Sequence, residues 1–192
     1  MSLIEIVLIT IGVSGEVFAT LECQGALVAK LEKKRLILAV ILIAIWQTVA
    51  LVAGIGLVSL LNKYDVQANN EAYIGKIIAV LIVGGMGLRM FLKAWENERI
   101  VEKREDELDV QKTFLAIFKS TIFPILTGIA FGFIGADLKT VLIAVACITM
   151  LMVVIGLYAG YRLGFEQKTK AYILGGLLLV ISGIDIIVRY IA

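Results

Sequence analysis

Four residues within otherwise apolar stretches carry oxygen atoms that a hard metal ion could bind: Glu16, Ser14, Gln47 and Asp185. A carboxylate such as that of Glu16 is costly at bilayer depth and is usually retained because it binds something. Carboxylate, hydroxyl and amide oxygens together suit Mn²⁺, Mg²⁺ or Ca²⁺. The four residues therefore predict a hard-cation site, provided that the fold brings them together.

Other kinds of chemistry have little support in the sequence. The chain has no histidine, which removes the commonest transition-metal ligand and proton shuttle. Cys23 and Cys147 have no second cysteine at a metal-binding spacing. No nucleophile with a nearby base, phosphate-binding glycine loop or nucleic-acid signature is present. We expect a protein that is not an enzyme, holds no tightly bound cofactor and has no nucleic-acid partner.

The composition is that of an integral membrane protein. Hydrophobic residues make up 60% of the 192 residues, and charged residues only 18%. A helix needs about 20 apolar residues to cross a hydrocarbon core of about 30 Å. The long, continuous apolar runs predict an all-α fold with six transmembrane helices. Their expected ranges are Leu3–Ala29, Leu36–Leu61, Tyr73–Ala94, Thr113–Gly135, Thr140–Gly164 and Ala171–Ile191.

Basic residues in the connections predict how the helices are oriented, because cytoplasmic loops carry the excess of Lys and Arg. The connections after the first, third and fifth helices hold Lys30, Lys33, Lys34, Arg35, Lys93, Arg99, Lys103, Arg104, Lys112, Arg162, Lys168 and Lys170. The opposite side holds only Lys63, Lys76, Lys139 and Arg189. We expect a multi-pass protein of the inner (plasma) membrane with both termini outside the cytoplasm.

The two halves of the chain resemble each other weakly. Ala72-Tyr73-Ile74 matches Ala171-Tyr172-Ile173, and the same offset aligns Gly84 with Gly183. We interpret residues 1–95 and 113–192 as two inverted three-helix repeats, joined by a charged cytoplasmic linker, residues 96–112. In such folds the substrate site lies near the midplane, where the repeats meet.

Depth along the helices ranks the candidate ligands. Glu16 lies roughly 20 Å from the outer end of its helix, near mid-depth. Gln47 is at a comparable depth, whereas Asp185 lies somewhat toward the outside. Each has a structural alternative: Gln47 can form hydrogen bonds between helices, and Asp185 can pair with a basic group. We also expect Glu22 to form an ion pair with Arg89 that joins the first and third helices.

Two short motifs stand out: Ser14–Ala19 followed by Gly25 in the first predicted helix, and Gly87–Met90 in the third. They resemble the Ser-x-Asp-Ala-Phe-Ala segment and the Gly-Gly-Lys-Met stretch of the MntP-type manganese efflux pump family, within the LysE-like exporter superfamily. The resemblance extends along the whole chain. Two departures mark a divergent member. Glu16 replaces the first-helix Asp, and the second acid, expected in the fourth helix, is replaced by Phe123.

The leading hypothesis is an exporter of a divalent cation, with Mn²⁺ as the first candidate, that works by alternating access with Glu16 as the central ligand. Protons are the candidate counter-ion. A second hypothesis is a transport-inactive membrane subunit or scaffold that binds a partner membrane protein, and the loss of the second acid favours it. A third is an exporter of a small organic solute that would contact Arg89. A homodimer is compatible with each hypothesis.

Overall fold

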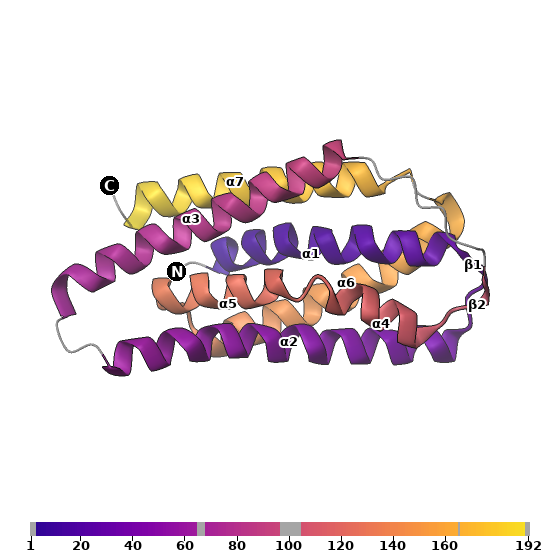
Figure 1. The fold of residues 1–192 in the computed structure, drawn as a ribbon, viewed down its shortest axis with the longest axis horizontal. Coiled ribbons are helices and arrows are strands. Elements are labelled where there is room, and N and C mark those ends of the chain that lie inside the picture. The colour runs from indigo at the N-terminus through magenta and orange to yellow at the C-terminus, as the bar shows by residue number, and fades with distance from the viewer. Residues whose placement is uncertain (1–2, 65–67, 97–104, 165, 191–192) are drawn as a thin grey trace.

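A computed structural model describes residues 3–64, 68–96, 105–164 and 166–190. These residues form a long helical bundle with two short strands at one end (Figure 1). The elements are α1 (Leu3–Ala26), β1 (Val28–Lys30), α2 (Lys33–Tyr64), α3 (Ala68–Trp95), β2 (Glu105–Glu107), α4 (Val110–Phe118), α5 (Ile122–Ile134), α6 (Leu138–Leu163) and α7 (Lys168–Tyr190).

The predicted all-α membrane fold is confirmed. Among the described residues, five helices are long and apolar enough to cross a membrane: α1, α2, α3, α6 and α7. The bent pair of α4 and α5 supplies a sixth span when the two are taken together. These elements coincide with the six apolar runs of the sequence, because a backbone in hydrocarbon must satisfy its hydrogen bonds within the segment.

The fourth predicted span, Thr113–Gly135, is divided into two helices, α4 and α5. The axes of α4 and α5 meet at 48°. Pro124 lies in the first turn of α5, where the missing N–H would have no partner within the helix. The break at residues 119–121 therefore precedes the proline, and Pro124 is compatible with the start of the second helix.

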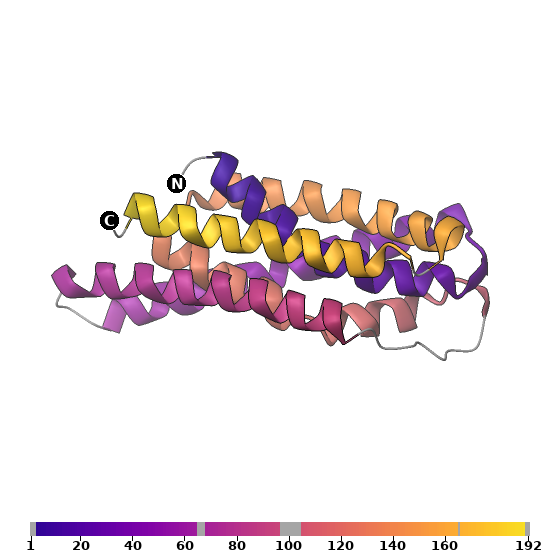
Figure 2. The ribbon, with the colours of Figure 1, turned by 90° about the horizontal axis from the view of Figure 1, so that it is seen from above.

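The six spans form a closed ring. Around it, α1 packs on α6, α6 on α2, α2 on the α4–α5 pair, α5 on α3, α3 on α7, and α7 on α1. Figures 1 and 2 both show α3 and α7 side by side, and successive spans run in opposite directions. The start of α1 and the end of α7 consequently lie at the same end of the bundle, opposite the strands (Figure 1).

Glycines set the closest helix contacts. A Cβ on Gly160 of α6 would lie 2.0 Å from the carbonyl oxygen of Glu22 on α1. Gly128 of α5 packs as closely on α2, since a Cβ on Gly128 would lie 2.1 Å from the Leu51 carbonyl oxygen and 3.1 Å from the Gly54 Cα. Small residues at these crossings let the helix backbones approach each other.

The strand end of the bundle is held by polar contacts. β1 and β2 form a two-stranded parallel sheet that joins the end of α1 to the segment before α4. Arg35 of α2 forms an ion pair with Glu107 and donates a hydrogen bond to the carbonyl oxygen of Leu108 at 3.1 Å. This end is therefore a water-compatible cap on an otherwise apolar bundle.

Candidate functional site

Glu16 is buried inside the bundle, with 1% of its side chain exposed. Its Oε1 atom accepts a hydrogen bond from the Nζ of Lys93 on α3, and the two side chains form an ion pair. Its Oε2 atom has no hydrogen-bond partner among the described residues. Glu16 therefore presents one neutralised oxygen and one oxygen able to accept a further ligand.

Lys93 is a site residue that the sequence analysis did not identify. Its ammonium nitrogen lies 5.5 Å from the centre of the Phe123 ring and 5.8 Å from that of Tyr172. Aromatic faces attract cations at such distances. Glu16, Phe123 and Tyr172 thus surround the ammonium on several sides. The sequence placed Lys93 among the loop cations, although it also fell within the predicted span Tyr73–Ala94, which was the available signal.

A vestibule adjoins Lys93 at the end of α3. This cavity of about 190 Å³ is lined by Lys93, Glu96, Lys168 and Tyr172. Lys93 is 32% exposed, whereas Glu16 behind it is almost completely buried. The side chain of Lys93 consequently separates the Glu16 carboxylate from the vestibule.

A second, neutral chamber lies where α1, α2, α5 and α6 meet. Ser14 and Gln47, both sequence candidates, line it together with Thr10, Thr127 and Thr149. Its volume of about 10 Å³ is close to the minimum that holds one water molecule. The Gln47 Nε2 atom has no hydrogen-bond partner within the described part of the chain. The chamber is thus a buried cluster of neutral oxygens.

Asp185 does not contact Glu16, so the expectation that the two carboxylates share one cation site is not met. It accepts a hydrogen bond from Arg189 at 2.9 Å, and Arg189 also pairs with Glu5 at 3.2 Å. Glu5 and Glu16 are separated by about 16 Å along α1 at 1.5 Å per residue. Asp185 therefore belongs to a charged cluster at the end of the bundle that holds the termini.

The expected ion pair between Glu22 and Arg89 is replaced by other contacts. Glu22 accepts a hydrogen bond from the backbone N–H of Gln167 at 2.7 Å, which ties α1 to the start of α7. The guanidinium of Arg89 lies 5.1 Å from the centre of the Phe123 ring. Both residues thus connect helices, but not to each other.

The residues that the structure describes contain no group of three or more Asp, Glu, Cys or His side chains that could hold a metal. The four predicted ligands lie in three places: Glu16 beside Lys93, Ser14 and Gln47 in the neutral chamber, and Asp185 near the termini. A cation at Glu16 would have one carboxylate and would need neutral oxygens or water to complete its shell.

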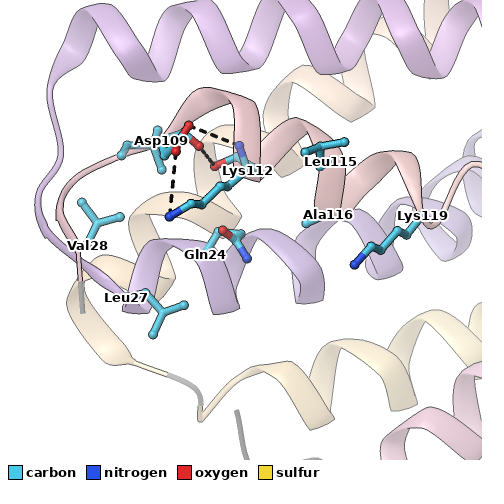
Figure 3. Close-up of a pocket in the computed structure, with 10 residues that line it drawn as sticks. Gln24, Leu27, Val28, Asp109, Lys112, Leu115, Ala116 and Lys119 are labelled. Atoms are coloured by element: carbon cyan, nitrogen blue, oxygen red, sulfur yellow. Dashed lines mark hydrogen bonds and ion pairs between the residues drawn. The ribbon is translucent and has the colours of Figure 1, made fainter. Parts of the chain in front are cut away.

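A larger cavity of about 420 Å³ lies at the strand end, between the end of α1, β1 and α4 (Figure 3). Asp109 on its wall caps α4, accepting hydrogen bonds from the backbone N–H groups of Gln111 and Lys112 at 2.9 and 3.2 Å. Lys112 and Lys119 bring positive charge to this wall. Such a surface does not suit a cation, so we do not assign the cation site to it.

Comparisons with known proteins place the chain in a family. Residues 30–187 match the model of the family described as "Putative manganese efflux pump". The chain belongs to this family. It is 24% identical over 190 residues to a protein of Mannheimia succiniciproducens, covering 99% of this chain and 98% of the relative. For a Clostridium perfringens protein the identity is 23% over 210 residues, with coverage of 99% and 96%. Both relatives carry the description "Putative manganese efflux pump MntP".

A shorter match reaches an archaeal member. A Methanosarcina acetivorans protein with the same description is 28% identical over 113 residues, which is 59% of this chain and 60% of the relative. No solved structure matches the chain. The resemblance inferred from the motifs is confirmed, and the protein is a multi-pass membrane protein of the manganese efflux pump family.

Proposed function

We propose that this protein exports a divalent cation, with Mn²⁺ as the leading candidate, and that Glu16 is its ionic ligand. The observation that carries the proposal is a buried carboxylate with an unpartnered oxygen in a membrane span of a manganese efflux pump family member. An intramembrane acid of this kind marks an ion pathway by default.

The cavities suggest a path for the ion. The vestibule gives access from the strand end to Lys93 and, behind it, Glu16. Ser14 lies on the same helix and lines the neutral chamber with Gln47. We propose that the ion binds first at Glu16 and then passes by the chamber oxygens, which supply neutral ligands once the carboxylate has drawn the ion out of water.

We propose alternating access between two inverted repeats, residues 1–95 and 113–192. In this division α1 corresponds to the α4–α5 pair, α2 to α6 and α3 to α7. Each helix contact of the ring then has a counterpart or is its own counterpart; for example, α1·α6 corresponds to α2·α5. Gly183 lies next to Gly84, with which the sequence aligns it, because a Cβ on Gly183 would lie 3.9 Å from the Gly84 nitrogen. Rocking of one repeat against the other would open the site to each side in turn.

The direction of transport follows from the distribution of basic residues. We propose that the strand end and the linker, residues 96–112, lie in the cytoplasm of a plasma-membrane protein, and that both termini lie outside. The vestibule would then load from the cytoplasm. After release, the site needs a positive charge to neutralise Glu16 again, and a proton or a basic side chain can supply it.

A transport-inactive subunit or scaffold, either as a homodimer or with a partner membrane protein, is the second candidate. Two observations favour it: Glu16 already has an internal counter-charge in Lys93, and the position of the second family acid is occupied by the buried Phe123. In this account Glu16 and Lys93 only hold α1 against α3. Such a protein would bind no Mn²⁺.

Mn²⁺ flux into proteoliposomes separates the two candidates. Liposomes that contain the wild-type protein and an entrapped dye that Mn²⁺ quenches should lose fluorescence on addition of Mn²⁺, faster than liposomes with the dye but without the protein. Glu16→Gln should abolish the difference, because the amide keeps the shape but not the charge. Equal quenching by wild-type and empty liposomes would contradict the transporter, and equal flux through Glu16→Gln would contradict the role of Glu16.

A further inference from the structure

The ammonium group of Lys93 lies where a bound cation would be expected. It contacts a carboxylate oxygen of Glu16 and lies near the faces of two aromatic rings, Phe123 and Tyr172. A carboxylate with surrounding π-faces attracts positive charge irrespective of its source. Lys93 therefore fills a cation site with a cation that belongs to the protein itself.

A divalent ion and this ammonium cannot share the site favourably. Both need the Glu16 carboxylate, and the like charges repel each other strongly in a buried environment, where solvent screening is weak. Glu16 is 1% exposed, so water screens charges at its carboxylate only weakly. Binding of the ion at Glu16 therefore requires Lys93 to leave.

The structure offers Lys93 a second acidic partner. Glu96 lies one residue beyond the end of α3, and its backbone N–H still donates to the carbonyl oxygen of Leu92 at 3.0 Å. Residues three apart on a helix are neighbours on its surface. Both side chains line the vestibule, which has the space for a rotated lysine. A change of side-chain rotamer can thus carry the ammonium from Glu16 to Glu96 while the backbone stays in place.

We propose that Lys93 is a tethered counter-cation of the Glu16 site. It neutralises Glu16 when no ion is bound, and it withdraws into the vestibule toward Glu96 when a hard divalent cation takes the carboxylate. The proposal rests on the proposed function. It assigns to Lys93 the neutralisation of the emptied site, for which a proton would otherwise be needed.

Mn²⁺ binding to the purified full-length protein in detergent tests the proposal, with the electron paramagnetic resonance signal of free Mn²⁺ as the readout. Lys93→Met removes the charge but keeps an unbranched side chain between the aromatic rings, and it should tighten Mn²⁺ binding about tenfold or more, as expected when a close competing charge is lost. Lys93→Arg retains a cation and should stay within about threefold of wild type. Lys168→Met removes a charge from the same vestibule and is the matched control, with an expected change below about threefold.

A measurement on the wild-type protein avoids any dependence on the folding of the variants. Acylation of lysines by an amine-reactive reagent, followed by mass spectrometry, should label Lys93 faster in saturating Mn²⁺ than without it, while Lys168 serves as the internal reference. Faster labelling is expected because the ion frees the ammonium from Glu16.

The outcomes distinguish the two levels of inference. Mn²⁺ binding that Lys93→Met leaves unchanged or weakens, or labelling of Lys93 that Mn²⁺ does not accelerate, contradicts the counter-cation and leaves the exporter standing. Absence of Mn²⁺ binding in the wild type and in every variant contradicts the proposed function and the Lys93 proposal together.

Discussion

Glu16 on α1 and Lys93 on α3 form an ion pair inside the ring of spans, between two helices that otherwise have little contact. The two helices are not neighbours in the ring, since α1 packs on α6 and α7, and α3 on α5 and α7. The pair is thus a polar connection across the interior of the bundle, and it involves the carboxylate that we propose as the ion ligand.

The ion pair should contribute to stability as a unit. Glu16→Gln or Lys93→Met alone should each lower the free energy of unfolding by about 1–3 kcal/mol, because each leaves one partly buried charge without its partner. The double variant should lose clearly less than the sum of the two. A thermal-unfolding double-mutant cycle in detergent measures this coupling, and strictly additive losses would show that the pair does not act as a unit.

Asp185 should be dispensable for transport. Asp185→Asn removes an exposed i,i+4 pair with Arg189, which contributes about 0.3–0.5 kcal/mol at most. Mn²⁺ flux through this variant should match the wild type in proteoliposomes at equal protein density. A loss of flux comparable to that of Glu16→Gln would instead place Asp185 on the ion path.

Gln47 should matter for transport more than for stability. Gln47→Leu replaces a buried amide, whose Nε2 atom has no hydrogen-bond partner among the described residues, by an apolar group of similar size. Removing an unsatisfied polar group is neutral or stabilising. The melting temperature should therefore stay the same or rise, while Mn²⁺ flux should fall about tenfold or more, as for the loss of one oxygen ligand. Unchanged Mn²⁺ flux would show that the ion does not pass by the neutral chamber.

The α1·α6 crossing should tolerate no added side chain. Gly160→Ala would place a Cβ 2.0 Å from the Glu22 carbonyl oxygen, so the helices must separate, at an expected cost of about 1–3 kcal/mol. Gly56→Ala on α2 is the matched control, because a Cβ there has no atom within 4 Å. Thermal unfolding should show a lower melting temperature for Gly160→Ala only. Equal melting temperatures would mean that the crossing adapts freely.

The number and approximate extent of the membrane spans could be predicted from the sequence, because a span must be long and apolar, whatever it packs against. The ranges of α1, α2, α3, α6 and α7 follow from this requirement alone. The range Thr113–Gly135, expected as one span, did not show where α4 ends and α5 begins. In the structure Pro124 lies in the first turn of the second helix, where a proline costs least.

The direction in which a side chain faces around its helix was harder to predict than its depth in the membrane. Ser14 and Glu16 are two positions apart, which is about 200° around a helix, so only one of them can face a given neighbour. The structure accordingly places Ser14 in the neutral chamber and Glu16 beside Lys93. Asp185 was assigned to Glu16 on approximate depth and charge alone, yet its sequence neighbour Arg189 already offered a partner at i,i+4.

Lys93 was missed because a lysine near the end of a span is normally taken to reach the interface. The direction of the Lys93 side chain depends on which helices surround the end of α3, and no sequence pattern predicts those neighbours. In the structure the Lys93 side chain contacts the buried Glu16 and also lines the vestibule.

The central claim is that Glu16 binds the transported cation, and anomalous X-ray scattering from Mn²⁺-soaked crystals tests it most directly. Crystals of the Lys93→Met protein are the most sensitive sample, because the competing ammonium is absent. The account predicts an anomalous peak within bonding distance of the Glu16 carboxylate, and no such peak in crystals of the Glu16→Gln variant. A peak at Asp185 or elsewhere with none at Glu16, or no peak in well-soaked crystals, would contradict the account.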